Sequence, residues 1–336
     1  MRFSKPDGVT RAAFHPARQT PKAPKKQRLV VGVVLTCALA VGGCSSTTPK
    51  TQNQSGDGGK PEKPLVVASF YPLAFVAERL VSDVATTVNL TPPGAETHDL
   101  EVTPDQAVTI EDAALVLTMG QGLQPSIEDA AKRRASGVVS LLNALGIAEP
   151  KPTDTKDADH KRTYDRSEAD PHVWLDPQLM QNAVAEIATA LATVFPESID
   201  DINIRATDLG AELRALDAAY VAGLSGCQGR LLISSHAAFG RLAQRYGLVD
   251  ESITGQSPEA EPTADRLATL AELVKAKGVK TIFSEQLVSQ KIAENLARES
   301  GIVVAVLDPL ESAPKQGDYF VAMINNLAIL RSGLGC

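Results

Sequence analysis

Residues 178–224 hold two helical stretches around Pro196 with no strand between them, and this region constrains the fold more than any other feature. The second stretch, of roughly 28 residues, would be about 42 Å long at ~1.5 Å per residue, enough to pass from one lobe to another. On both sides of it, short β-branched runs alternate with helical patterns, as in "RLLIS" followed by "HAAFGRLAQRYG". Because this alternation is typical of βαβ units, the sequence predicts an α/β fold with a mainly parallel sheet in each of two lobes.

The first 43 residues have the layout of an export signal. Eight Lys or Arg and one Asp accompany the apolar run "LVVGVVLTCALAVGGC", which is too short to span a bilayer comfortably. Val41-Gly42-Gly43-Cys44 resembles a lipobox, in which the cysteine is acylated, and the polar stretch 44–63 fits a flexible tether. We interpret the chain as an exported lipoprotein on the outer face of the cytoplasmic membrane. A transmembrane anchor and plain secretion are the alternatives.

Removal of the signal leaves a strongly acidic chain. Of 33 Lys or Arg and 40 Asp or Glu, the signal takes eight and one, which leaves 25 and 39 and a formal charge of −14. This charge argues against nucleic acid or an anionic membrane face as a partner, and it is compatible with a cationic one.

Two of the four cysteines remain once Cys37 leaves with the signal and Cys44 is acylated. In an oxidising compartment, Cys227 and Cys336 are expected to form a disulfide. Two free thiols and a metal-binding pair are the alternatives.

Three of the five histidines fall where a parallel sheet binds ligands, beyond the carboxyl ends of its strands. His98 comes after "TTVNL", His172 lies in the proline-framed "ADPHVWLDP", and His236 follows "RLLISS". Two carboxylates fall on the same face, because Glu285 follows "TIFS" and Asp308 ends "IVVAVLD". Three imidazoles and a carboxylate that converge between two lobes would supply four donors, which suits tetrahedral Zn²⁺.

Each of these residues also has an ordinary structural interpretation. A single loop histidine is more often hydrogen-bonded or at the surface, Asp308 could cap a turn, and Glu285 could pair with a lysine. The sequence lacks an HExxH motif, so a metal site requires the fold to bring distant segments together. Of the other histidines, His15 leaves with the signal and His160 lies in the polar stretch 149–169, which is predicted to be a mobile surface insertion.

A series of motifs identifies a family resemblance. The motifs "HDLEVTPDQ", "DPHVWLDP", "SSHAAFGRLAQRYGL", "GQSPEAEPTADRL", "FSEQLVSQKIAENLARESG" and "LDPL" are similar to those of the zinc and manganese class of metal-binding solute-binding proteins of ABC importers, over residues 64–336. The resemblance implies two lobes, each with a four-stranded sheet flanked by helices, joined by one long rigid helix, with the metal between them. The corresponding segments are an N-terminal lobe at 64–195, a linking helix at 196–225 and a C-terminal lobe at 226–336.

Carried over by position, the resemblance implies that His98, His172 and His236 are nitrogen ligands and that Asp308 adds a carboxylate from the second lobe. Some members take the carboxylate three residues further on, which here is Glu311, so both residues stay open as the fourth ligand. Glu285 matches a glutamate of the family that we interpret as contacting a ligand and not the metal.

The resemblance also bears on the metal. Manganese-binding members tend to have glutamate where His236 stands, and imidazole in place of carboxylate moves the preference toward zinc, so Zn²⁺ is expected over Mn²⁺. Zinc-binding members often carry a histidine-rich loop before the second ligand, but here that loop is acidic and contains only His160, which puts a zinc-gathering role in doubt. Ala237 replaces an aspartate common in the family, which bears on how His236 is oriented.

The expected function is capture of Zn²⁺ without chemistry and its delivery to an ABC permease, by a monomer that is not an enzyme. The sequence has no GxxxxGK(S/T) loop, so a separate ATPase must drive transport. There are two alternatives with the same fold. One is a manganese-binding importer protein, and the other is a surface adhesin or metal chaperone. An exported zinc hydrolase, with Glu285 as base, is a further one, although the sequence has no HExxH, HxxEH or GxSxG motif.

Overall fold

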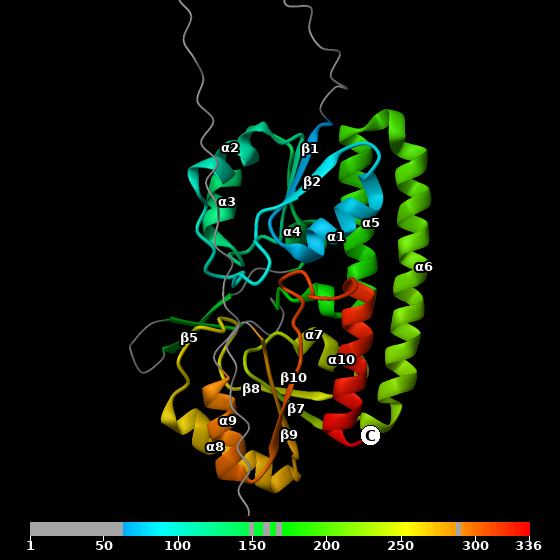
Figure 1. Ribbon diagram of the computed structural model, residues 1–336. Helices are drawn as coiled ribbons and strands as arrows, with labels where there is room; N and C mark the ends of the chain where they lie inside the picture. Colours follow the sequence, from blue (N-terminus) through cyan, green and yellow to red (C-terminus); the bar gives the residue numbers. More distant parts are fainter. Residues whose placement is uncertain (1–62, 148–150, 157–161, 166–169, 287–289) are drawn as a thin grey trace, which may run out of the picture. The chain divides into compact units, whose positions relative to one another are not determined.

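The structure, a computed structural model, describes residues 63–147, 151–156, 162–165, 170–286 and 290–336 (Figure 1). The predicted export signal, Cys44 and all of the predicted tether except Lys63 therefore lie outside the described residues. Within the described part of the chain, no helix combines the length and the apolar composition that a membrane span needs.

The N-terminal lobe is built on a parallel four-stranded sheet in the order β2-β1-β3-β4. The central strands are buried, because Val66, Val67 and Val116 are fully inaccessible to solvent. Helix α2 begins with Pro104 after a capping box in which Thr103 and Gln106 bond each other's backbone N–H. The elements of this lobe are β1 (Leu65–Ala68), α1 (Tyr71–Val81), β2 (Thr86–Asn89), α2 (Pro104–Asp112), β3 (Leu115–Thr118), α3 (Pro125–Ala131), β4 (Val138–Ser140) and α4 (Leu141–Ala144).

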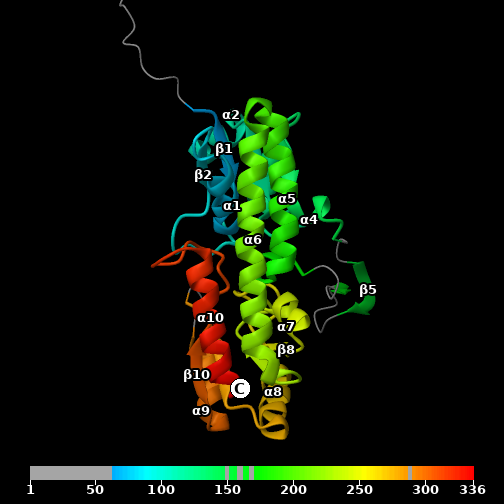
Figure 2. The ribbon, with the colours of Figure 1, turned by 90° about the vertical axis from the view of Figure 1, so that its right-hand side faces the viewer.

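The long helical region predicted from the sequence is present, and along the chain it lies between the strands of the first four-stranded sheet and those of the second. It consists of η1 (Val173–Leu175), α5 (Pro177–Val194), η2 (Pro196–Ser198), α6 (Ile199–Leu224) and η3 (Ser225–Cys227). Asp176 caps α5 by accepting from the N–H groups of Gln178 and Leu179. The 26 residues of α6 span about 39 Å at ~1.5 Å per residue, and Figure 2 shows this helix running beside both lobes.

The C-terminal lobe repeats the architecture with a parallel sheet in the order β10-β9-β7-β8. Its elements are β7 (Leu231–Ser234), α7 (Gly240–Tyr246), β8 (Val249–Ser252), α8 (Ala264–Lys277), β9 (Thr281–Ser284), α9 (Lys291–Ser300), β10 (Val303–Val306) and α10 (Tyr319–Leu334). The fold class is therefore the predicted one, two α/β lobes with one parallel four-stranded sheet each.

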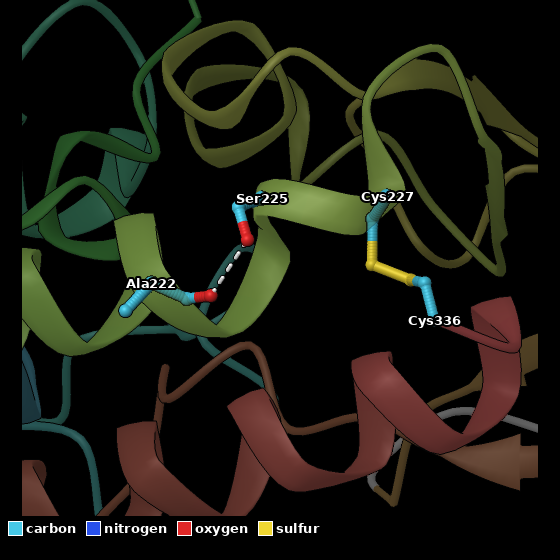
Figure 3. Close-up of a disulfide and its surroundings, with 4 residues drawn as sticks. All are labelled: Ala222, Ser225, Cys227 and Cys336. Atoms are coloured by element: carbon cyan, nitrogen blue, oxygen red, sulfur yellow. Dashed lines mark hydrogen bonds between the residues drawn. A yellow bond between two sulfur atoms is a disulfide. The ribbon is translucent and has the colours of Figure 1, made fainter.

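Helices α6 and α10 join the lobes through a shared core. One cluster of buried apolar side chains includes Phe70 of the N-terminal lobe, Leu213 of α6 and Tyr319 of α10. The hydroxyl of Tyr220 donates to the backbone O of Met323 at 2.7 Å, which fixes α6 against α10. Cys227 and Cys336 form the expected disulfide and tie the C-terminus to the end of the linking region (Figure 3).

Two segments differ from the sequence prediction. Residues 151–156 and 162–165, within the expected irregular insertion, form a two-stranded antiparallel ribbon, β5 (Lys151–Lys156) with β6 (Arg162–Asp165). Helix α7 starts at Gly240 and not at His236, because residues 236–239 form a turn in which Ala237 N–H donates to Gly255 O.

Candidate metal site

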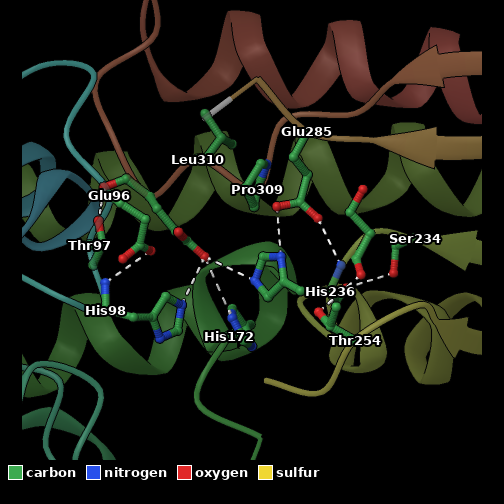
Figure 4. A network of polar contacts seen from close by, with 12 residues as sticks. Glu96, Thr97, His98, His172, Ser234, His236, Thr254, Glu285, Pro309 and Leu310 are labelled. Atoms are coloured by element: carbon green, nitrogen blue, oxygen red, sulfur yellow. Dashed lines mark hydrogen bonds and ion pairs between the residues drawn. The ribbon is translucent and has the colours of Figure 1, made fainter. Parts of the chain in front are cut away.

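His98 lies in the loop between β2 and α2, where a local carboxylate shapes the chain. Glu96 accepts from the backbone N–H of His98 at 3.0 Å and of Asp99 at 2.9 Å. This arrangement tightens the loop around the histidine, whose side chain is only 11 % exposed. Figure 4 shows His98 pointing toward the two other histidines.

His172 is held by the aspartate two residues before it. Asp170 Oδ1 accepts from the backbone N–H of His172 at 3.0 Å and contacts ring atom Nδ1 at 2.7 Å. Because a carboxylate accepts, this bond keeps a proton on Nδ1 and leaves Nε2 to face the centre of the site. The Asp-Pro frame of the sequence therefore orients the fully buried His172 ring.

His236 is held in the same manner by a residue from another strand end. Glu285, which directly follows β9, accepts from the His236 backbone N–H at 3.1 Å through Oε1. Its Oε2 contacts His236 Nδ1 at 2.6 Å, and both side chains are buried (Figure 4). The position of Glu285 beside a ligand candidate, and outside the cluster itself, is the one the family resemblance implies.

The carboxylate that joins the three imidazoles is Glu311. Its Oε1 lies 3.4 Å from His98 Nε2, 3.6 Å from His172 Nε2 and 3.3 Å from His236 Nε2. The side chain of Glu311 is 5 % exposed, so this meeting point is shielded from solvent.

Asp308, the residue first expected to supply the carboxylate, is not a member of this cluster. Its Oδ1 accepts from the backbone N–H of Leu310 at 2.8 Å, so it caps the turn after β10. Leu310 has a φ of +58° in this turn, and the reversal directs Glu311 to the imidazoles. Of the two carboxylates that the resemblance left open as the fourth ligand, the structure therefore places Glu311, and not Asp308, beside the three histidines.

The distances from Glu311 Oε1 to the three imidazoles are those of a tetrahedral zinc site. The four candidate ligand atoms, from His98, His172, His236 and Glu311, all lie within 4.8 Å of one another. With zinc bonds of ~2.0–2.2 Å, the edges of a tetrahedron are about 3.3–3.6 Å, close to the distances from Glu311 Oε1 to each Nε2. Nε2 of His172 and of His236 are buried without a hydrogen-bond partner, an arrangement that is costly unless something else binds there.

The electrostatics of the cluster favour a cation. Burial alone would raise the pKa of Glu311, but the surrounding imidazoles hold this pKa well below its usual value. Burial opposes the charged form of His236, but Glu285 and Glu311 outweigh it and raise the His236 pKa to about 10. The pKa of His172 is also raised, since Asp170 and Glu311 outweigh burial. The acidic residues around the imidazoles therefore favour positive charge in the cluster.

Two residues of the site escaped the sequence analysis. Asp170 lies in the proline-framed segment, and its position two residues before His172, typical of a local side chain-to-backbone bond, is the signal by which the sequence could have identified it. Trp174 is the second of these residues. Its indole Nε1 donates to Pro309 O at 2.7 Å, which connects the turn of Glu311 to the segment of His172.

Comparison with known proteins gives concordant results over nearly the whole described chain. The family model described as "Zinc-uptake complex component A periplasmic" matches residues 66–333. The zinc-binding protein AdcA of Streptococcus pyogenes serotype M3 is 33% identical over 283 residues, covering 79% of this chain but 55% of its own length. The chain thus spans about half the length of that relative. The high-affinity zinc uptake system protein ZnuA of Bacillus subtilis is 31% identical over 310 residues, with 90% of this chain and 96% of the relative covered.

Among solved structures, the Zn(II)-bound ZnuA-like domain of Streptococcus pneumoniae AdcA superposes with a TM-score of 0.65 at 29% identity. The superposition covers 82% of this chain and 100% of that domain. With the extent of the family match, the two-lobed fold and the histidine–glutamate cluster in agreement, the chain belongs to the family of zinc-uptake complex component A proteins.

Proposed function

We propose that His98, His172, His236 and Glu311 bind one Zn²⁺ and that the protein captures this ion outside the cytoplasm for an ABC permease. The observation that carries the proposal is the contact of one buried carboxylate oxygen with three Nε2 atoms at 3.3–3.6 Å. The named relatives bind or take up zinc, and their names describe no enzymatic activity.

The donor set favours zinc over manganese. Three imidazole nitrogens and one carboxylate oxygen suit the tetrahedral geometry of Zn²⁺, whereas Mn²⁺ prefers sites richer in oxygen. Glu285 and Asp170 are already engaged with His236 and His172, so they act on the ligands and leave the cation to the cluster. With Glu311 as the fourth donor, no position remains for the reactive water of a hydrolase.

The proposal that the protein delivers zinc to a permease is supported by the sequence of its N-terminal region. The lipobox-like Val41–Cys44 and the polar tether would anchor a monomer to the outer face of the cytoplasmic membrane, beside its permease. A separate ATPase would supply the energy. Because α6 runs beside both lobes and shares their core, we expect release to involve the loops that carry the ligands more than a large hinge movement.

Metal analysis of the purified domain from residue 45 onward tests the zinc assignment. We expect one zinc per chain, and loss of most of it in His236→Ala. His160→Ala, which removes the histidine of the insertion, is the matched control and should retain one zinc. Equal zinc in the wild type and in His236→Ala would overturn the assignment of this ligand.

Growth of cells in zinc-limited medium tests the transport role. Deletion of the gene should reduce zinc accumulation, and deletion of the gene for the zinc permease should give the same defect without an additive effect. A surface adhesin or a chaperone with the same site would show no dependence on the permease.

A further inference from the structure

Glu311 reaches the three imidazoles from a turn that must be held in place by its surroundings. Leu310, directly before it, has a φ of +58°, a left-handed conformation that a leucine adopts only when neighbouring contacts impose it. The base of the turn is fixed to α10, because Asp308 N–H donates to Asn326 Oδ1 at 3.0 Å and Asn326 Nδ2 donates back to Asp308 O at 2.6 Å. These bonds hold one end of the turn but not the end nearest the site.

After Glu311, the chain is held to the N-terminal lobe, because Thr97 Oγ1 donates to Glu311 O at 3.1 Å and Gly94 N–H donates to Ser312 Oγ at 2.8 Å. Before Glu311, the end nearest the site is held by Trp174. Its indole Nε1 donates to Pro309 O at 2.7 Å, and its own backbone O accepts from the hydroxyl of Tyr319 at 2.6 Å. Trp174 and Tyr319 are both fully buried, so neither bond competes with water. The first bond joins the residue two positions after His172 to the residue two positions before Glu311, and the second fixes Trp174 to α10.

The indole ring of Trp174 is itself held in place by two neighbouring rings, those of Phe70 and His172. Phe70 packs edge-on against Trp174 with the ring centroids 4.8 Å apart, and the His172 ring lies 5.1 Å away. Indole offers a donor and no acceptor, so the carbonyl of Pro309 is a well-matched partner for it. Trp174 therefore transmits the position of the N-terminal lobe to the turn that carries the fourth candidate ligand.

We infer that Trp174 is a positioning residue for Glu311, one that sets the distance of its carboxylate from the imidazoles and thereby the zinc affinity and the rate of zinc release. The inference rests on the proposed zinc site and deepens it. Loss of the indole donor would free the segment before Glu311, so that Leu310 can relax from its left-handed conformation and the carboxylate can shift about the part of the chain that Thr97 still holds. The three histidines would keep their own restraints from Glu96, Asp170 and Glu285.

A double-mutant cycle tests this inference, with zinc affinity and dissociation rate measured by chelator competition. Trp174→Phe keeps an apolar ring and removes the donor; we expect zinc affinity to fall about 10- to 100-fold, the loss typical of residues that orient metal ligands. In a Glu311→Ala background, Trp174→Phe should change the affinity less than twofold, because the residue through which it acts is absent.

Two further variants keep the test decisive. Tyr319→Phe removes only the hydroxyl that bonds Trp174 O, so it should give a smaller loss that also disappears in the Glu311→Ala background. Tyr220→Phe removes a similarly buried hydroxyl bond between α6 and α10, away from the ligands, and should leave zinc affinity unchanged.

The outcomes separate the inference from the proposed function. Absence of zinc binding in the wild type would overturn both. Wild-type binding with an unchanged affinity in Trp174→Phe, or with the same loss in both backgrounds, would overturn only the role of Trp174 in positioning Glu311.

Discussion

Glu285 holds His236 at two points, since one carboxylate oxygen accepts from the backbone N–H at 3.1 Å and the other contacts ring Nδ1 at 2.6 Å. Asp170 holds His172 in an equivalent way, at 3.0 Å and 2.7 Å. In both cases the carboxylate fixes a backbone and a ring together, and the remaining nitrogen is turned toward Glu311. The orientation of two of the candidate ligands therefore depends on two acidic residues, Asp170 and Glu285, that are not ligands themselves.

Replacement of Glu285 by glutamine tests this dependence. The amide is close to isosteric, but only one of its two polar ends accepts, so it cannot bond both N–H groups of His236. We expect zinc affinity to fall about 10- to 100-fold with the fold retained. Titration against a competing chelator measures the change, with Glu299→Gln on the exposed face of α9 as the matched control. An affinity equal to that of the wild type would show that His236 needs no such restraint.

The sequence was sufficient to predict the two sheets and the faces on which His98, His172 and His236 lie, because strand–helix alternation determines where the carboxyl ends of parallel strands meet. The sequence was not sufficient to predict which carboxylate of the turn after β10 joins the histidines. Asp308 and Glu311 are both carboxylates close to a strand end, and the choice between them depends on the φ of Leu310, which is set by tertiary contacts. The ribbon formed by β5 and β6 was not predicted, because its sequence does not alternate between apolar and polar residues as a half-buried strand does.

Substitution at the two carboxylates distinguishes their roles. Glu311→Ala removes a candidate ligand, so zinc affinity should fall by more than about 100-fold, beyond the loss expected for an orienting residue. Asp308→Ala removes the cap on Leu310 N–H and should cost about 1 kcal/mol of stability, with a smaller effect on affinity. Calorimetric titration and thermal unfolding of both variants measure the two effects. The reverse order of affinities would restore Asp308 as the ligand.

The pH dependence of zinc binding should extend above the ordinary histidine range. The pKa of His236 is raised to about 10, so this ring carries an extra proton at pH 7 when no metal is bound, and the pKa of His172 is shifted in the same direction. Zinc must displace the extra proton of His236, and the apparent affinity should therefore rise from pH 6 to pH 9, by up to about tenfold per pH unit for each proton displaced. Calorimetry in buffers of different ionisation enthalpy counts the protons released. An affinity independent of pH across this range would count against imidazole ligation.

The metal-free protein should show the opposite trend in stability. A histidine whose folded pKa lies above its unfolded value near ~6.5 stabilises the fold fully below that pH, and the contribution is lost as pH rises toward the folded pKa. For His236 the window runs from about 6.5 to about 10. We expect the Tm of the metal-free protein to fall across this window and the difference from the zinc-loaded protein to widen.

Gly240 offers a test that alters no charged or ligating residue. It is the first residue of α7, and a Cβ at this position would lie 2.8 Å from Asp170 Oδ2. Gly240→Ala should therefore displace Asp170, disturb His172 and lower zinc affinity about tenfold. Gly210→Ala is the control, because its Cβ would meet only Arg214 Nη1 at 3.5 Å. This change within α6 should stabilise the protein by about 1 kcal/mol and leave the affinity unchanged. Equal affinities in both variants would contradict a role for Asp170.

The disulfide should stabilise the C-terminal lobe without affecting the site. Cys227 and Cys336 are 109 residues apart with Cα atoms at 5.4 Å, so the bond closes a loop containing the whole C-terminal sheet. Cys227→Ser with Cys336→Ser should lower the free energy of unfolding by about 2–4 kcal/mol, as measured by urea denaturation. Zinc affinity should stay within twofold, because Cys227 precedes the start of β7 whereas His236 follows its carboxyl end. Two reactive thiols in the unreduced, denatured wild type would instead support the alternative of free cysteines.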